Sequence, residues 1–324
     1  MIKLHKTPTY ILCFLVSVWM MASCSTSGSK PQDTAYSVSK PEIEALKDTL
    51  FAITQQYPGE IGIALFTDRG DTVVINNEDK YPLMSVFKLH QAISLCRHFE
   101  QTGISPDTVV TIARANLNSD TWSPMLKDIH DDPIVIPVRD LMLYALQQSD
   151  NNASNYMFEN FQSVGDVDSF IATLIPRESF RLAVTEAEMW SDHALSTSNH
   201  SSPLSAALLI DRLFTDSIIS RQNRDFICSA LSTCKTGTDR IVAPLAGIDS
   251  VTVAHKTGSG FCDEQGRLMA HNDVAYISLP EGRHYTLAVL VKDFDGTEEQ
   301  ASQAIALISQ RVWTALSTCY SAGS

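Results

Sequence analysis

The sequence predicts an α+β protein, in which one antiparallel sheet is flanked by N- and C-terminal helices and an all-helical subdomain is inserted into it. Three observations predict this fold. An amphipathic helix and a strand pair precede residue 76, strand patterns return only after residue 249, and the chain between them is mostly helical. A last amphipathic pattern then closes the chain, so the two ends supply both the sheet and its covering helices.

The first residues have the layout of a secretory signal. Lys3 and Lys6 precede an apolar run at residues 10–22, so we assign residues 1–23 to a signal peptide. Residues 21–24, Met-Ala-Ser-Cys, resemble a bacterial lipobox with Met21 in place of the usual leucine. This predicts a lipid on Cys24, a flexible tether over residues 24–40 and a periplasmic location. The alternative is ordinary cleavage, with Cys24 incidental.

Composition excludes several classes of function. The 324 residues carry a formal net charge of −13 and no basic stripe, which argues against a nucleic-acid partner. Past the N-terminus no stretch is apolar enough to span a membrane, so we expect membrane contact only through Cys24. None of the seven cysteines is paired at C-x-x-C spacing, so we expect no metal and no cofactor. Whether a disulfide forms stays open.

The elements follow in order along the chain. Residues 41–57 show helical periodicity, and residues 61–66 and 72–75 form a hairpin around a turn at residues 68–71. Further helices are predicted at residues 138–147, 153–161, 167–175, 203–213, 216–231 and 297–317, and further strands at 250–256, 274–279 and 285–291. We therefore predict an α/β subdomain from residues 41–84 and 241–320, and a helical subdomain from residues 85–240. The weakly periodic stretch between residues 175 and 203 is long enough to be functional.

Ser85 and Lys88 are the first candidates for chemistry. Apolar residues after Ser85 mark one buried helical face: Val86, Leu89, Ile93 and Cys96. Ser85 then lies in the first turn, with Lys88 on the same side. A lysine within reach can take the serine proton if its pKa is lowered. Since S-x-x-K also occurs by chance, the alternative is a capping serine and a solvated lysine.

Three further motifs follow. Ser149-Asp150-Asn151 lies between two predicted helices, Glu186 lies in the long stretch, and Lys256-Thr257-Gly258 ends a predicted strand. The order S-x-x-K, S-D-N, K-T-G is the signature of class A β-lactamases and penicillin-binding proteins. The chain therefore resembles a class A serine β-lactamase over nearly all of its mature length. Residues 185–189 and 255–260 are most similar to the branch that includes extended-spectrum cephalosporinases. The resemblance implies the β-lactamase/transpeptidase-like fold.

The resemblance implies a role for each motif residue. Ser85 would attack the β-lactam carbonyl, with its own N–H and that of Ser259 as the oxyanion hole. Lys88 would help to activate Ser85; whether the acylation base is this lysine or the loop glutamate is disputed for the family. Ser149 would relay a proton to the lactam nitrogen. The remaining roles are substrate binding by Asn151, Lys256 and Thr257, close approach of the strand at Gly258, and a structural part for Asp150.

Glu186 would activate the water that clears the acyl-enzyme, and Glu188 is its rival. Two departures from the family pattern concern this loop: Ala187 replaces a common proline, and Trp190 replaces an asparagine that helps to hold the water. Turnover therefore depends on whether Trp190 is compatible with deacylation.

Two more residues and one decoy complete the candidates. Residues 235–237 are a second Lys-Thr-Gly, but no strand precedes them, so we choose residues 256–258. Arg240 resembles an arginine that reaches the substrate carboxylate, and the alternative is a surface arginine. Trp122 resembles an aromatic residue that packs against substrate, and the alternative is an ordinary core or surface tryptophan.

The sequence thus predicts a monomeric serine β-lactamase that acts on cephalosporins and penicillins. The alternatives are a D-alanyl-D-alanine peptidase (a penicillin-binding protein), a β-lactam sensor that is acylated without turnover, and a degenerate homologue in which Trp190 blocks the water. Glu186 argues against the peptidase, and the missing transmembrane segment argues against the sensor.

Overall fold

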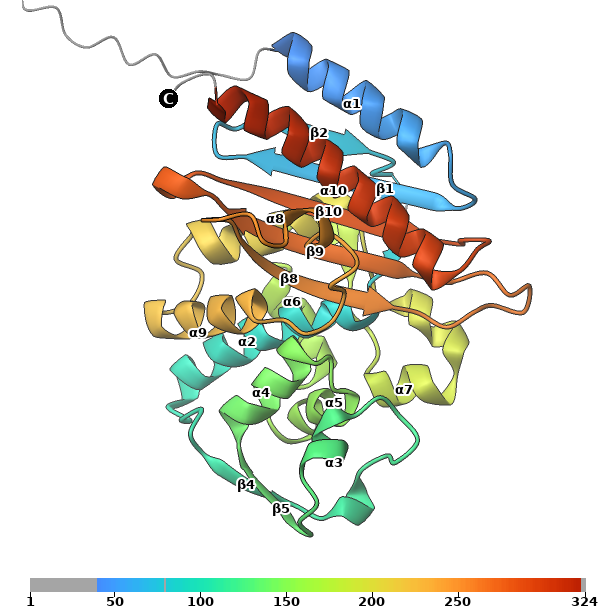
Figure 1. Ribbon diagram of the computed structural model, residues 1–324. Helices are drawn as coiled ribbons and strands as arrows, with labels where there is room; N and C mark the ends of the chain where they lie inside the picture. The colour runs from blue at the N-terminus through green and yellow to red at the C-terminus, as the bar shows by residue number, and fades with distance from the viewer. Residues whose placement is uncertain (1–39, 79, 322–324) are drawn as a thin grey trace, which may run out of the picture. The chain divides into compact units, whose positions relative to one another are not determined.

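A computed structural model describes residues 40–78 and 80–321 of the protein (Figure 1). The predicted signal peptide and Cys24, with nearly all of the tether, lie outside these residues. No helix within the described part is long and apolar enough to cross a membrane.

The centre of the described part is a five-stranded sheet in the order β2-β1-β10-β9-β8, with every neighbouring pair antiparallel. Its strands are β1 (Glu60–Thr67), β2 (Thr72–Ile75), β8 (Thr252–Ser259), β9 (His271–Ser278) and β10 (His284–Lys292). The predicted hairpin and the three later strands therefore form one sheet, which confirms the expected fold class.

Alternation along the strands divides the core into two layers. In β1, Ile61, Ile63 and Leu65 face the terminal helices, whereas Ala64 faces the helical segment. The terminal helices α1 (Lys40–Thr54) and α10 (Glu298–Ser321) cover the first face together (Figure 1). On the second face a Cβ at Gly62 would lie 2.5 Å from Pro203, so this glycine allows α8 (Pro203–Thr215) to pack tightly on the sheet.

The segment between β2 and β8 is mainly helical, as predicted. Its helices are α2 (Phe87–Thr102), α3 (Pro124–Asp128), α4 (Val138–Gln147), α5 (Asn151–Asn160), α6 (Val164–Ile171), α7 (Glu186–Ser191), α8 (Pro203–Thr215) and α9 (Arg221–Ser232). Short 3₁₀ turns join them: η1 (Met84–Val86), η2 (Arg114–Asn116), η3 (Arg177–Ser179), η4 (His193–Ser198) and η5 (Ala243–Leu245), with η6 (Pro280–Gly282) between β9 and β10.

Residues 87–96 of helix α2 are buried on all sides rather than on one face. The four apolar residues predicted to be buried are buried, but so are Lys88, His90, Gln91 and Ser94. Polar groups are tolerated in a core when they are paired: Gln91 exchanges hydrogen bonds of 2.9 and 2.8 Å with Ser154. An amphipathic pattern indicates one buried face and gives no sign that other helices enclose the second.

Several boundaries differ from the prediction. Helix α9 begins at Arg221 rather than residue 216, because the Ser220 hydroxyl caps it and Asp216 already ends α8. Strand β8 continues through the whole Lys-Thr-Gly motif to Ser259, and β9 begins three residues earlier than predicted. The weakly periodic stretch is also not an unstructured loop, since it contains α7 and two 3₁₀ turns.

The sequence analysis missed five short strands, which form two small sheets: β3 (Tyr81–Pro82) with β6 (Phe180–Arg181) and β7 (His200–Ser201), and β4 (Val109–Ile112) with β5 (Ile134–Pro137). They were missed because the paired segments are two to four residues long and lie far apart in sequence, so no local turn signals the pairing. The division into subdomains at residues 84 and 240 stays a prediction.

Candidate active site

Ser85 lies in the 3₁₀ turn η1 and not in the first turn of an α-helix, which corrects the prediction. The residue before it, Met84, has a φ of +45°, a left-handed conformation that is uncommon for a side chain of this size. Helix α2 begins directly after the turn and carries Lys88. As a result the Ser85 Oγ lies 2.8 Å from Lys88 Nζ and donates a 3.0 Å hydrogen bond to Glu186 Oε1.

Lys88 is almost completely buried and surrounded by acceptors. Besides Ser85, its ammonium donates to the Ser149 carbonyl at 2.8 Å and to Asn151 Oδ1 at 2.7 Å, and it lies 2.7 Å from Glu186 Oε1. An unpaired charge in this position would cost several kcal/mol, which these partners offset. Burial lowers the pKa of Lys88, while the neighbouring Glu186 opposes this shift. Lys88 therefore gives up its proton more readily than an exposed lysine does, and it is better suited to accept the proton of Ser85.

Ser149, Asp150 and Asn151 occupy the short connection between α4 and α5. Ser149 has a φ of +61°, and its side chain accepts a 3.1 Å hydrogen bond from Lys256. Asp150 is the N-cap of α5, where its carboxylate accepts from the Ala153 N–H at 2.8 Å. The structure thus gives Asp150 the structural part expected of it, and it places the other two motif residues beside Lys88 and Lys256.

Lys256, Thr257 and Gly258 lie on β8, the edge strand next to η1. Burial lowers the pKa of Lys256 to about 7, and the charge of Lys88 contributes to the shift. A Cβ on Gly258 would lie 2.4 Å from the Leu83 carbonyl oxygen. The glycine therefore allows the strand to approach the backbone that carries Ser85. The sequence analysis predicted that Gly258 would allow the strand to come close to the ligand instead.

The two loop glutamates have different environments. Glu186 is buried at the start of α7 beside Ser85, whereas Glu188 closes a capping box in which its carboxylate accepts from the Thr185 N–H at 2.7 Å. The side chain of Asn155 also accepts from the Ala187 N–H at 3.1 Å and so ties α7 to α5. Of the two carboxylates, the structure therefore brings Glu186 to the candidate nucleophile.

Arg240 is buried, so the surface-arginine alternative is wrong. Its guanidinium donates to the Asn272 carbonyl at 2.7 Å and to the Ser259 hydroxyl at 2.6 Å. Burial lowers the pKa of Arg240, and the nearby carboxylates of Asp273 and Asp239 oppose the shift. The guanidinium therefore holds β8 at Ser259 and, through a 3.3 Å hydrogen bond to its carbonyl, at Gly258.

Trp122 and Trp190 pack against different parts of the chain. The Trp122 side chain is half exposed, its indole N–H donates to the Gln148 carbonyl at 2.8 Å, and its own carbonyl accepts from the Asn151 N–H at 3.0 Å. Trp190 lies 6.0 Å from the ring of Phe261 and 6.1 Å from the ring of His193, and the last two rings stack at 3.6 Å. The indole that replaces the expected asparagine therefore packs towards the β8–β9 loop.

One supporting residue escaped the sequence analysis. Asn272 on β9 donates from its buried amide to the Pro82 carbonyl at 2.7 Å and to the Leu83 carbonyl at 3.2 Å. It thereby fixes the segment that leads into Ser85. The only signal was a run of three polar residues, 271–273, beside a predicted apolar strand.

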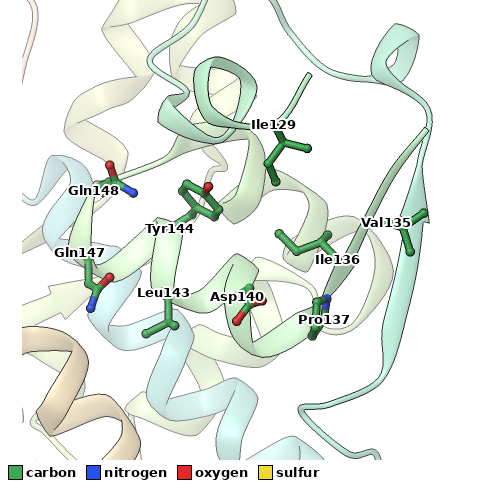
Figure 2. Close-up of a pocket in the computed structure, with 9 residues that line it drawn as sticks. All are labelled: Ile129, Val135, Ile136, Pro137, Asp140, Leu143, Tyr144, Gln147 and Gln148. Atoms are coloured by element: carbon green, nitrogen blue, oxygen red, sulfur yellow. The ribbon is translucent and has the colours of Figure 1, made fainter. Parts of the chain in front are cut away.

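A surface groove of about 370 Å³ lies between α4 and β5 (Figure 2), but none of the predicted site residues lines it. Its lining residues are Ile129, Val135, Ile136, Pro137, Asp140, Leu143, Tyr144, Gln147 and Gln148. Across residues 40–78 and 80–321 we find no group of three histidine, cysteine or acidic side chains arranged to hold a metal ion.

Comparisons with known proteins agree with this network. The model of the β-lactamase enzyme family matches residues 44–316. The chain belongs to the β-lactamase enzyme family. A β-lactamase of Phocaeicola vulgatus is 53% identical over 93% of each chain, and the extended-spectrum β-lactamase PER-1 of Pseudomonas aeruginosa is 28% identical over 83% of this chain and 86% of the relative.

Solved structures of class A and extended-spectrum β-lactamases are also similar to this β-lactamase. A class A β-lactamase from Bacteroides cellulosilyticus superimposes with a TM-score of 0.80 at 26% identity, covering 86% of this chain and 99% of that one. The TLA-3 extended-spectrum β-lactamase gives a TM-score of 0.80 at 25% identity, with coverage of 85% and 99%. The resemblance to class A serine β-lactamases, and with it the assignment as an enzyme, is confirmed. The comparisons thus favour a β-lactamase over the peptidase and sensor alternatives.

Proposed function

We propose that Ser85 is the acylated nucleophile of this β-lactamase and that Glu186 activates the water that hydrolyses the acyl-enzyme. The observation that carries the proposal is the position of the Ser85 hydroxyl, within 3.0 Å of both Lys88 and Glu186. Each of the two groups can reach the serine proton, so acylation has two available bases. The buried Glu186 carboxylate then stays next to the ester that forms on Ser85.

The second serine supports the departure of the lactam nitrogen. Both lysines of the site contact Ser149: Lys256 donates to its hydroxyl, and Lys88 donates to its carbonyl. We assign proton relay to Ser149, amide binding to Asn151, and binding of the substrate carboxylate to Lys256 and Thr257. Ser259, held by Arg240, is assigned to the oxyanion hole together with the Ser85 N–H.

We further propose that the substrates are cephalosporins and penicillins, and that their hydrolysis confers resistance. Support comes from relatives named for extended-spectrum activity, at 28% identity for PER-1 and 25% for TLA-3. Export to the periplasm, a lipid on Cys24 and a monomeric state complete the proposal, and they rest on the sequence alone.

The experiment is hydrolysis of a chromogenic cephalosporin by the purified protein, with intact-mass spectrometry on the same sample. We expect turnover without a lasting adduct. Ser85→Ala should lower the rate by on the order of 10⁶, as the loss of a serine nucleophile does elsewhere. A stable adduct without turnover would contradict the role of Glu186, and near wild-type hydrolysis by Ser85→Ala would remove Ser85 as nucleophile.

A further inference from the structure

The two N–H groups assigned to the oxyanion hole lie on different segments of the chain. Ser85 lies in the turn η1, whereas Ser259 is the last residue of strand β8. Both N–H groups must point at the same developing oxyanion, so the oxyanion hole works only at one separation of these two segments. The contacts that join η1 to the end of β8 therefore set the distance between the two donors.

The Asn272 side chain connects the sheet to the segment that leads into η1. Asn272 is completely buried on β9 and lies opposite Gly258 in the pairing of β8 with β9. Its amide nitrogen donates to the carbonyl groups of Pro82 and Leu83, at 2.7 and 3.2 Å. Its Oδ1 accepts from the Val291 N–H of β10 at 3.1 Å, and this partner fixes the direction in which the amide points.

The Asn272 backbone is tied in turn to the end of β8. The buried guanidinium of Arg240 donates to the Asn272 carbonyl at 2.7 Å, to the Gly258 carbonyl at 3.3 Å and to the Ser259 hydroxyl at 2.6 Å. The Leu83 carbonyl oxygen that accepts from Asn272 is also the atom that a Cβ on Gly258 would meet at 2.4 Å. Close packing against β8 and a hydrogen bond from β9 therefore act on the same carbonyl group.

The backbone of η1 needs this restraint. Met84 has a φ of +45°, a conformation that persists for such a residue only where its surroundings impose it. A return to an ordinary φ would rotate either the peptide group that contains the Leu83 carbonyl or the next one, which contains the Ser85 N–H. By holding the Pro82 and Leu83 carbonyls, Asn272 therefore stabilises the strained turn that carries the nucleophile.

We propose that Asn272 is a positioning residue for the oxyanion hole, and that its two hydrogen bonds set the separation of the Ser85 and Ser259 N–H groups. The inference rests on the proposed function, which assigns these two groups to the oxyanion hole. The oxyanion exists only in the transition state and the tetrahedral intermediate. A displaced donor therefore lowers kcat and kcat/KM together and leaves KM nearly unchanged.

Asn272→Asp tests the two hydrogen bonds, because an ionised carboxylate has the same shape as the amide and cannot donate. We expect kcat for a chromogenic cephalosporin to fall by roughly ten- to a hundredfold, as a small displacement of a catalytic group does, with KM within a few-fold of wild type. A protonated carboxyl regains one donor, and burial raises its pKa above the ordinary value of about 3.9. The loss of kcat should therefore be smaller near pH 5 than near pH 8, with the wild type measured at each pH.

Infrared spectroscopy of the acyl-enzyme measures the oxyanion hole directly. Glu186→Gln should trap the ester on Ser85, and hydrogen bonds from the oxyanion hole lower the stretching frequency of the ester carbonyl. Adding Asn272→Asp to this variant should move the carbonyl band to higher frequency, because the two donors no longer both reach the oxygen. A loss of stability elsewhere in the fold would leave this band where it is.

The matched control is Asn76→Asp. The Asn76 amide donates to the Ile61 carbonyl at 2.8 Å beside β2, at the opposite edge of the sheet from β8, so kcat and the carbonyl band should not change. If Asn272→Asp does not fold, Asn272→Ser, whose hydroxyl is too short to reach both carbonyls, takes its place. Unchanged kcat and an unchanged band in the folded variant would overturn the role of Asn272, as would an equal fall of kcat in Asn76→Asp. Absence of an adduct on Ser85 in the wild type and in Glu186→Gln would instead contradict the proposed function, and this inference with it.

Discussion

Each of the two buried lysines of the site donates to one serine hydroxyl, but their surroundings differ. Lys88 has four acceptor groups around it, including the Glu186 carboxylate at 2.7 Å. Lys256 has the Ser149 hydroxyl and the Thr257 carbonyl, at 3.1 and 2.9 Å. Burial lowers the pKa of both lysines; the Glu186 carboxylate opposes this shift at Lys88, and the pKa of Lys256 falls to about 7. Lys256 therefore changes charge near neutral pH.

The pH profile of kcat/KM should show this change. Only protonated Lys256 attracts a substrate carboxylate, and its pKa is lowered to about 7, so its contribution is present below pH 7 and lost as the pH rises through that value. Lys256→Arg keeps its charge at every working pH, and the alkaline fall of kcat/KM should move upward by at least about one pH unit, since arginine does not deprotonate in proteins. The same alkaline limb in both proteins would show that another group titrates.

Glu186→Gln tests the carboxylate of the loop. The amide fills the same volume and cannot take a proton, so acylation should remain detectable, through Lys88, while deacylation slows by roughly 10²- to 10⁴-fold. Intact-mass spectrometry should then show the acyl-enzyme accumulating on Ser85. Glu188→Gln is the matched control, because it changes an exposed capping residue two positions away and should leave turnover within a few-fold of wild type. Accumulation in the control instead would assign the water to Glu188.

At the scale of an element, α7 positions Glu186 through contacts at both of its ends. The Thr185 capping box fixes its first turn, and the Asn155 side chain holds the Ala187 N–H. Trp190, in its last turn, packs beside Phe261 of the β8–β9 loop. The helix has only six residues, too few to be stable alone, so these contacts determine where the carboxylate lies.

Trp190→Ala should loosen the far end of α7 and slow deacylation. A displacement of about 1 Å at a catalytic group can cost on the order of a hundredfold in rate, so we expect kcat lower by roughly ten- to a hundredfold, with the acyl-enzyme visible by mass spectrometry. Phe51→Ala, which removes a half-exposed aromatic side chain on α1, serves as the control. Faster turnover in Trp190→Ala would instead mean that the indole obstructs the water.

At the scale of the whole molecule, segments distant in sequence are joined by the sheet. Strand β1 pairs with β10 along its full length, from Glu60 opposite Lys292 to Thr67 opposite Tyr285. Helices α1 and α10 then share one apolar layer on that sheet (Figure 1). Helix α1 and strand β1 therefore share one sheet and one apolar layer with β10 and α10, and the helical segment that carries Ser85, Ser149 and Glu186 lies between these two groups of elements in the sequence.

The proposed anchor of the molecule is tested by Cys24→Ser. The lipid proposed on the Cys24 thiol would attach the protein to a membrane, and the hydroxyl of serine cannot receive it, so the variant should move from the membrane to the soluble fraction. Cys262→Ser, which changes an exposed cysteine of the described part, is the control and should fractionate as the wild type does. An unchanged distribution of Cys24→Ser would remove the lipoprotein proposal.

The sequence by itself determined the fold class and the motifs. Strand alternation and helical periodicity predicted the five sheet strands, the two terminal helices and the helical insertion, because these patterns depend on local geometry that every residue of an element shares. The order of the serine, lysine and glutamate motifs was enough to name the family, and the structure then gathered Ser85, Lys88, Ser149, Asn151, Glu186 and Lys256 into one hydrogen-bonded network.

Only the tertiary structure decided what each polar residue contacts. It separated Glu186 from Glu188 by burial, buried Arg240 against Ser259, and showed that Gly258 makes room for the Leu83 carbonyl. The physical reason is the same throughout. Hydrogen bonds and charges act over a few ångströms of space. The sheet brings together side chains that are far apart in the sequence, so their sequence positions do not reveal the distance between them.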